Sequence, residues 1–525
     1  MFKKVAIVAC PSMELERPPA AIGILAAISK SLDRDTAVFD LNLKFYNDLG
    51  AADWINAEKF WRLREPLEPE LQQRVDNLFD QYIQEIVDWS PDLLAISVFT
   101  LMSNKASSEF LSRWKESTRL STCIVAGGQG VTTPYNVDFE KTNSVLQATT
   151  NLNFGQYLQR QGLVDHYVIG DGEDAFISIL NGNFKHHGID GQPSKQLENL
   201  DSYPIPDYSF NNPTTYKYTQ YPGVYITASR GCIRKCTFCD VPDRWPKFKY
   251  RTGKNVALEI FTHWKQYGVK IFQLTDSVVN GNLREFLSMN RALAEYQEQN
   301  LDMNIKLLGQ FNIRDKSQMT EEQYSTMAKA GWRVLVPGVE SASERVRSAM
   351  GKDFSNQDLD WHLYQCAKWG IQNVFLMFVG YPSETIDDHQ ENLTMLTRYQ
   401  KYMYAGTILM IRWGYTGSLD TGSPLSNKDL NFNIVPQIPD LDLTHLLEHD
   451  QYWIYGRNWI NLNNPTLTFD ERIRRRLELH EKSIELDWPV TRPREELMIL
   501  EKIVKQFKGI GDPVTGTVFT EVGDH

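Results

Sequence analysis

Short apolar segments alternate with segments of helical periodicity in two successive blocks of this 525-residue chain. In the first block, strand-like runs such as VAIVAC (5–10) and LLAISV (93–98) are continuous apolar stretches, and helical stretches lie between several of them. Continuous apolar strands joined through helices are typical of a parallel sheet that is covered on both faces. Residues 1–196 are therefore predicted to form a parallel α/β domain, whose ligands bind at the carboxyl ends of the strands.

The second block, residues 223–420, repeats the alternation with strand-like GVYITAS (223–229), KIFQLTDS (270–277) and NVFLMFVG (373–380). Repeated strand–helix units over this length predict a full or partial (β/α) barrel, whose chemistry is located where the strands end. Residues 197–222 are rich in proline, asparagine and tyrosine and are interpreted as a linker.

Residues 421–525 are predicted to form a mainly helical C-terminal region, which is a candidate cap over the barrel mouth. Within it, Arg472, Arg474, Arg475 and Arg476 are expected to form a solvated helix face; a site for an anionic substrate is the alternative.

Composition narrows the class of protein. The chain has 55 Lys and Arg against 66 Asp and Glu, and this acidic balance of −11 disfavours nucleic acid as a partner. No apolar run approaches the length of a membrane span, and the apolar run near the N-terminus is too short for a signal peptide. We therefore expect a cytoplasmic protein with no membrane partner. In that compartment, cysteines bind metals or take part in catalysis more often than they form disulfides.

Half of the six cysteines lie in one loop, at Cys232, Cys236 and Cys239, directly after the strand-like segment 223–229. A structural zinc site needs four ligands, but there is no second cysteine pair, and the nearest downstream histidine is His263. A cubane iron–sulfur cluster is ordinarily held by four thiolates. Three thiolates therefore leave one iron open to a substrate or a cofactor.

The spacing Cys232-x-x-x-Cys236-x-x-Cys239, with Phe238 before the last cysteine, resembles the signature of radical S-adenosylmethionine (radical SAM) enzymes. The resemblance implies a [4Fe–4S] cluster held by these cysteines, with SAM chelating the open iron and yielding a 5′-deoxyadenosyl radical. Later segments resemble the SAM-binding segments of that family in order and spacing. They imply SAM contacts at Phe238, Asp276, Arg314, Glu340, Ser341, Gly380 and Glu384. No catalytic residue is assigned.

The first block resembles the Rossmann-like cobalamin-binding domain of one radical SAM subclass, through RPPAAIGILAA (17–27), CIVAGGQGVT (123–132) and VIGDGEDAF (168–176). The D-x-H-x-x-G motif of classical cobalamin enzymes is absent, as is common in this subclass. The resemblance covers roughly residues 1–420 and implies cobalamin contacts at Ser12, Ser97, Gly127, Gly128, Gly170, Asp171 and Glu173. Methylthiolation of transfer RNA is disfavoured, because the other cysteines, Cys10, Cys123 and Cys366, are isolated in the sequence.

The resemblance therefore implies a cobalamin-dependent radical SAM methyltransferase that acts on an unactivated carbon or a phosphorus of a small molecule. An electron donor such as flavodoxin or ferredoxin is expected as a partner. Two alternatives stay open. One is a cobalamin-independent radical SAM enzyme that performs oxidation, epimerisation or cyclisation and retains the first domain as a scaffold. The other is a non-enzymatic iron–sulfur electron-transfer protein.

Overall fold

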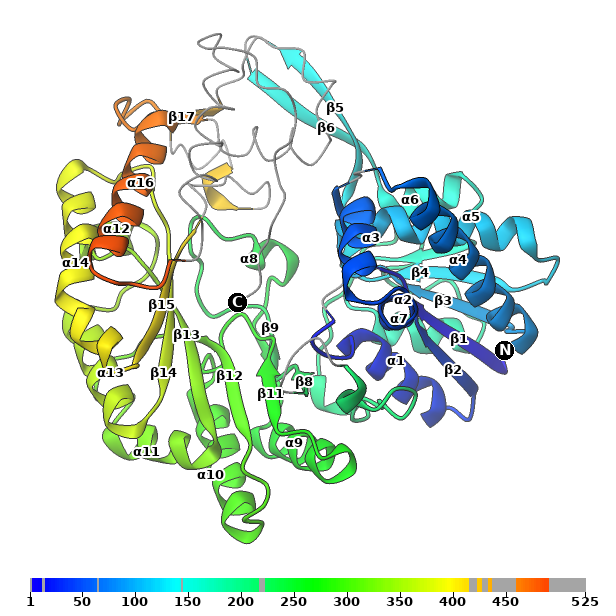
Figure 1. The fold of residues 1–525 in the computed structure, drawn as a ribbon, viewed down its shortest axis with the longest axis horizontal. Coiled ribbons are helices and arrows are strands. Elements are labelled where there is room, and N and C mark those ends of the chain that lie inside the picture. The colour runs from blue at the N-terminus through cyan, green and yellow to red at the C-terminus, as the bar shows by residue number, and fades with distance from the viewer. Residues whose placement is uncertain are drawn as a thin grey trace.

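The structure, a computed structural model, describes residues 2–11, 15–63, 66–142, 145–216, 222–414, 423–426, 433–436 and 459–490. Two parallel sheets dominate it, one in each half of the chain (Figure 1). None of the helices in the described ranges is long and apolar enough to span a membrane.

The first sheet has five parallel strands in the order β2-β1-β3-β4-β7. They are β1 (Lys4–Ala9), β2 (Asp35–Asp40), β3 (Leu93–Ser97), β4 (Cys123–Gly127) and β7 (His166–Val168). The helices of this half are α1 (Ala20–Ser31), α2 (Leu41–Leu49), α3 (Ala51–Leu63), α4 (Pro69–Trp89), α5 (Asn104–Ser117), α6 (Phe154–Arg160) and α7 (Glu173–Leu180). Ala6 and Val8 of β1 pack with α2 to α5, whereas Val5 and Ile7 pack with α1 and α7. Both faces are covered, so the predicted Rossmann-like sheet is confirmed.

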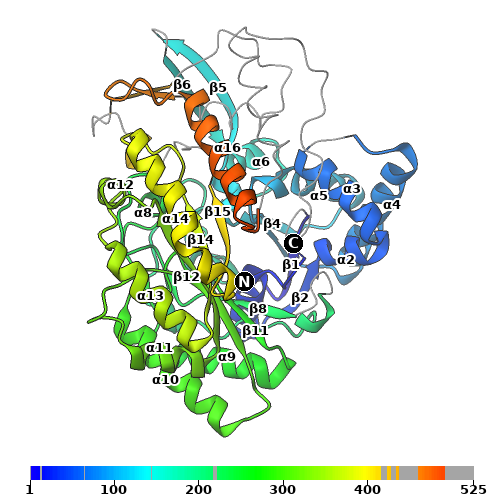
Figure 2. The same cartoon turned by 60° about the vertical axis from the view of Figure 1, so that its left-hand side comes forward.

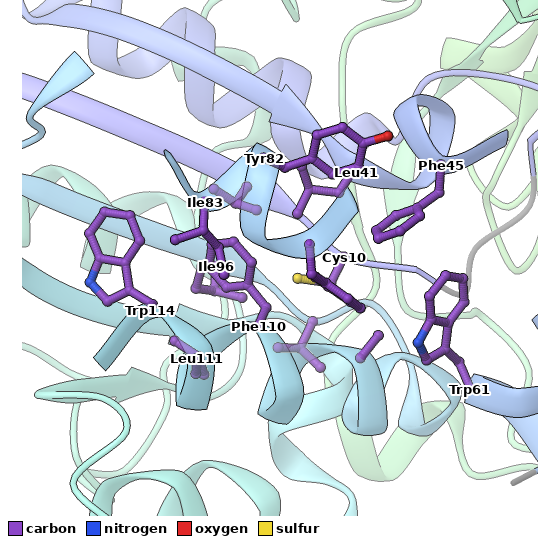
Figure 3. Packing of buried hydrophobic residues seen from close by; sticks show 14 of the residues in the cluster. Cys10, Leu41, Phe45, Trp61, Tyr82, Ile83, Ile96, Phe110, Leu111 and Trp114 are labelled. Atoms are coloured by element: carbon purple, nitrogen blue, oxygen red, sulfur yellow. The ribbon is translucent and has the colours of Figure 1, made fainter. Parts of the chain in front are cut away.

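Cys10 follows β1 and lies inside the core on one face of this sheet, among side chains that include Phe45 and Phe110 (Figure 3). Burial raises the pKa of the Cys10 thiol to about 12, so the thiol is neutral at physiological pH. Cys10 is therefore a core residue.

A β-hairpin that the sequence pattern did not predict follows β4. Its strands, β5 (Pro134–Thr142) and β6 (Val145–Asn153), pair antiparallel and project away from the first sheet (Figure 1). Strand β6 approaches β16 (Ile434–Pro436), a short strand of the C-terminal region.

The second sheet has six parallel strands in the order β15-β14-β13-β12-β11-β8. They are β8 (Gly223–Ile226), β11 (Ile271–Leu274), β12 (Lys306–Phe311), β13 (Trp332–Glu340), β14 (Gln372–Met377) and β15 (Ile408–Trp413). The helices between them are α9 (Gly253–Tyr267), α10 (Leu283–Gln299), α11 (Glu321–Ala330), α12 (Glu344–Ala349), α13 (Asn356–Trp369) and α14 (Ile386–Tyr404). The sheet does not close, because its edge strands β15 and β8 do not pair. The barrel is therefore partial, with helices on its outer face (Figure 1).

The linker between the two sheets packs closely against both halves. Its short 3₁₀ turns are η3 (Leu200–Ser202) and η4 (Pro213–Thr215). The Tyr216 hydroxyl donates a buried hydrogen bond of 2.5 Å to Asp40 Oδ2, at the end of β2. Tyr208 is fully buried and packs against Gly23 of α1.

The described C-terminal residues contain helix α16 (Phe469–Glu485), which packs along α14 (Figure 2), and β16 paired antiparallel with β17 (Trp459–Asn461). The predicted solvated arginine face is wrong for three of its four members. Arg472, Arg475 and Arg476 are buried, and only Arg474 is exposed. The reason is that α16 turns this face toward β17 and the loop after β14, where Arg472 lies over the Trp459 ring at 3.8 Å.

Candidate active site

The cysteine loop begins where β8 ends. Strand β9 (Ser229–Arg230) pairs antiparallel with β10 (Lys249–Tyr250), and α8 (Val241–Arg244) lies between them in the chain. Gly231 has a φ of +82°, and a Cβ there would lie 2.7 Å from the Lys247 carbonyl oxygen, so this tight turn favours glycine. The three thiols that follow are free; Cys236 is buried, while Cys232 and Cys239 are partly exposed.

Thr237 and Phe238 of the cysteine loop contact the segments that follow α12 and β14 of the second half of the chain. Thr237 donates its N–H to the Met350 carbonyl at 3.1 Å, and its hydroxyl lies 2.8 Å from that of Tyr381. The Phe238 ring packs against the Phe378 ring, with centroids 5.2 Å apart. Phe238, predicted to contact SAM, thus joins the cysteine loop to the loop after β14.

The three cysteines fit a cluster better than a single metal ion. A closed structural zinc site needs four ligands, and the cysteine loop supplies three thiols. A cubane instead presents a separate iron to each thiolate.

Asp276, which follows β11, connects the strand end to the start of the cysteine loop. Its buried carboxylate accepts hydrogen bonds from the Ala228 N–H at 3.1 Å and from the Ser229 hydroxyl. Burial raises the pKa of Asp276 to about 6, against the lowering effect of these hydrogen bonds. The carboxylate is therefore fixed beside the cysteine loop.

Glu340 ends β13 with a φ of +65°, a left-handed backbone conformation that residues other than glycine adopt infrequently. Lys352 Nζ donates to Glu340 Oε1 at 2.9 Å and to the Gly338 carbonyl at 2.7 Å. Desolvation alone would lower the pKa of Lys352, but Glu340 and the nearby Cys236 hold it above its ordinary value. The neighbouring Ser341 is buried, and its hydroxyl accepts the Ser343 N–H at 3.2 Å.

Two arginines of α16 contact the loop after β14: Arg472 packs against Gly380, and Arg475 pairs with Glu384. Gly380 has a φ of +75°, and a Cβ there would lie 2.5 Å from Arg472 Cδ. Glu384 is buried; its Oε2 accepts the Gly380 N–H at 3.2 Å, and its Oε1 lies 2.8 Å from Arg475 Nη1. Burial raises the pKa of Glu384, and the Arg475 guanidinium opposes that rise. Glu384 therefore has protein partners for both of its carboxylate oxygens.

Arg314 lies in the loop after β12, where its side chain bonds neighbouring loops. Its Nη2 donates to the Asn280 carbonyl at 2.8 Å and to the Gly281 carbonyl at 3.2 Å. Burial, followed by the nearby Arg234, lowers the pKa of Arg314.

The strand ends of the first sheet lie along one edge, since Ser97 pairs in register with both Ala9 and Gly127, and Gly127 pairs with Val168. Gly128, at a φ of +105°, allows the Val98 carbonyl to approach closely, because a Cβ would lie 2.5 Å from that oxygen. Gly170, at a φ of +81°, similarly accommodates Ser194. Ser12 lies outside the described residues.

Asp171 and Glu173 reach across to the second half of the chain. Arg230 Nη1 lies 2.9 Å from Asp171 Oδ1 and 3.1 Å from Glu173 Oε2, and Nη2 also pairs with Glu173. Burial alone would lower the pKa of Arg230, but the two carboxylates raise it above its ordinary value.

The sequence did not indicate Arg230 or Lys352, and it did not indicate that Arg475 is a partner of Glu384; each of these cations pairs with a carboxylate that the sequence had singled out. The partners lie between 12 and 91 positions apart in the chain.

The chain is similar to known proteins in sequence and in fold. The family model for the Radical SAM superfamily matches residues 226–396. The chain is 22% identical over 319 residues to the uncharacterized methyltransferase PH0819 of Pyrococcus horikoshii, covering 60% of this chain and 65% of that protein. The chain thus spans slightly less than two thirds of that relative.

Two solved structures share the fold across most of the chain. The radical S-adenosylmethionine methyltransferase TsrM from Kitasatospora setae has a TM-score of 0.58 at 16% identity, covering 81% of this chain and 75% of that one. The cobalamin-dependent S-adenosylmethionine radical enzyme OxsB has a TM-score of 0.59 at 16% identity, covering 81% of this chain and 60% of that one. A radical SAM domain implies a [4Fe–4S] cluster and SAM as cofactors, and the three cysteines fit that cluster. Residues 226–396 thus match the Radical SAM superfamily, and the chain shares its fold with two radical S-adenosylmethionine enzymes, one of which is described as cobalamin-dependent.

Proposed function

We propose that this chain is a cobalamin-dependent radical SAM methyltransferase, which methylates an unactivated carbon or a phosphorus of a small molecule. The observation that carries the proposal is the contact between the carboxyl-end loops of the two sheets, made by Arg230 with Asp171 and Glu173. Ligands of parallel α/β sheets and barrels bind at these ends. A cofactor on the first sheet and one on the second would therefore lie close together.

Cys232, Cys236 and Cys239 would hold the cluster, and the loops around them would bind SAM. Glu340 and Arg314 bring charged groups to the ends of β13 and β12, where they can complement the ammonium and carboxylate of an amino acid. Asp276, at the end of β11, would support the SAM site by holding the start of the cysteine loop through Ala228 and Ser229. The loop from Gly380 to Glu384, with Phe238 and Ser341 nearby, would complete the site. Here Glu384 shapes the loop through Gly380 and Arg475.

The ligand of the first sheet would lie at the strand ends that carry Ser97 and Gly127. Gly127 has no side chain, so a ligand could approach its backbone closely. Gly128 and Gly170 keep the adjoining turns tight. The likeness to OxsB and TsrM, structures described with aqua-cobalamin and with cobalamin bound, supports cobalamin as the ligand.

When bound, the cluster and SAM supply a 5′-deoxyadenosyl radical and cobalamin supplies a methyl carrier. The protein's part is to orient these groups and to exclude water from the space between the two edges. We assign residues 1–196 to cobalamin, 197–222 to the linker, 223–420 to SAM and the cluster, and 421–525 to a cap over the substrate. An electron donor of the flavodoxin or ferredoxin type would reduce the cluster.

The test is expression with cobalamin supplied, followed by cobalt and iron analysis and turnover with methyl-deuterated SAM. The proposal requires near-stoichiometric cobalt and transfer of the label into a product. A protein that stays cobalt-free after anaerobic reconstitution, yet makes 5′-deoxyadenosine, would instead be a cobalamin-independent radical SAM enzyme.

A further inference from the structure

The turn between β7 and α7 contacts the second half of the chain through charged side chains. Asp171 in this turn and Glu173, the first residue of α7, both contact Arg230, which lies 57 positions after Glu173 and two residues before Cys232. The two acidic side chains are 4% and 8% exposed, although a turn of this kind is usually solvated. The contact thus joins the edge of the first sheet directly to the start of the cysteine loop.

Asp171 also bonds a residue that follows the cysteine loop in the chain. Trp245, which follows α8, donates its indole N–H to Asp171 Oδ1 at 3.0 Å. The other Asp171 oxygen accepts the Leu197 N–H at 2.9 Å, at the start of the linker. Asp171 is therefore connected to both ends of the cysteine loop, through Arg230 before it and Trp245 after it.

These partners leave the two carboxylates little capacity for a ligand. Both Asp171 oxygens and both Glu173 oxygens accept hydrogen bonds from the protein, and a guanidinium bound by two carboxylates is held in a fixed plane. We propose that Asp171, Glu173 and Arg230 form a latch that sets the position of the cysteine loop relative to the first sheet. They are then positioning residues rather than ligands of a cofactor. The consequence for catalysis rests on the proposed function, because only then do two cofactors face each other across the latch.

The test uses the full chain with its cluster reconstituted. Arg230→Gln removes the cation. Arg230→Lys keeps the charge but cannot form the bidentate pair with Glu173. Glu173→Gln removes one of the two carboxylates that bind Arg230. Asp174→Asn is the matched control, since it changes a carboxylate in the same turn whose partner is the Tyr203 hydroxyl. Arg113→Gln is a second control, because it removes a guanidinium held by carboxylates within the first half of the chain.

The first readout is hydrogen exchange at residues 231–240. The latch predicts that Arg230→Gln speeds exchange there by about tenfold or more, while β3 and β12 keep their protection. Glu173→Gln and Arg230→Lys should give smaller increases, and both controls should match the wild type. Unchanged exchange in Arg230→Gln and Glu173→Gln would overturn the proposal.

The second readout is the magnetic interaction between the reduced cluster and cob(II)alamin, measured by electron paramagnetic resonance in cobalamin-loaded protein. The latch predicts an altered interaction in Arg230→Gln and an unaltered one in Arg113→Gln. An interaction identical to that of the wild type in Arg230→Gln would also overturn the proposal. If the wild type binds no cobalt, the proposed function fails, and the exchange measurement alone decides whether the latch exists.

Discussion

Replacing Arg475 with methionine removes the partner of a buried carboxylate and leaves Glu384 with the Gly380 N–H. The two side chains are 5% and 0% exposed, and their closest atoms are 2.8 Å apart. Loss of one partner from a buried ion pair costs about 3–5 kcal/mol. Since about 1.4 kcal/mol is a factor of ten, local opening of the loop should become about a hundredfold more frequent or greater. Hydrogen exchange at residues 380–385 measures this opening.

The neighbouring Arg474 provides a matched control, because it also bonds two glutamates but on the exposed side of α16. Exposed pairs contribute about 0–1 kcal/mol, so Arg474→Met should change exchange by less than about fivefold. Adding Glu384→Gln to Arg475→Met removes the stranded charge and should restore part of the protection. Equal effects of the two arginine substitutions, or no recovery in the double variant, would refute the role given to the buried pair.

The Arg475→Met defect should depend on pH. Burial already raises the pKa of Glu384, and losing Arg475 raises it further above its ordinary value of 4.5. The folded variant then binds a proton more readily than the unfolded chain does. The loss of stability in the variant is therefore greatest above the pKa of Glu384 in the folded state. The loss becomes smaller as the pH falls through that pKa toward 4.5. The same exchange measurement at pH 8 and pH 5.5, corrected for intrinsic rates, checks the sign; a deficit that grows on acidification would contradict it.

Two further predictions concern the loops around the cysteines. Gly380→Ala combines a strained φ with a clash, whereas Gly268→Ala has a similar φ and open space, so the first should cost about 1–3 kcal/mol more in unfolding experiments. Equal costs would show that the packing against Gly380 is unimportant. Lys352→Met leaves Glu340 without its cation and should weaken SAM binding about tenfold or more. Lys368→Met, which removes an exposed pair, should leave SAM binding unchanged; unaltered binding in Lys352→Met as well would refute the inference.

The sequence predicted the parts of the fold that depend on local pattern. Continuous apolar strands such as β1 and β3 need cover on both faces, so their pattern alone indicated a parallel sheet. The position of Cys232 after an apolar strand similarly located the cysteine loop at a strand end. The hairpin of β5 and β6 was missed because neither of its strand sequences, PYNVDFEKT and VLQATTNLN, is a continuous apolar run of the kind that identified the other strands.

The partners of charged side chains could not be predicted, because they depend on tertiary contacts. Arg475 lies on a helix whose arginine-rich segment looks solvated, yet it pairs with Glu384, 91 positions earlier. Asp171 and Glu173 were correctly located at a strand end, but nothing local indicates that Arg230 occupies them. Helical periodicity identifies the apolar face of a helix and gives no information about which carboxylate a cation will meet.

We propose that Cys232, Cys236 and Cys239 hold a cluster with one iron open to SAM. The most direct test of this proposal is the electron paramagnetic resonance spectrum of the reduced, reconstituted protein, recorded with and without saturating SAM, alongside iron and sulfide analysis. The wild type should contain about four of each per chain, and SAM should change its spectrum. The variant with Cys232, Cys236 and Cys239 replaced by alanine should lose the cluster and form no 5′-deoxyadenosine. A spectrum indifferent to SAM, or full iron and sulfide content in the triple variant, would contradict the account.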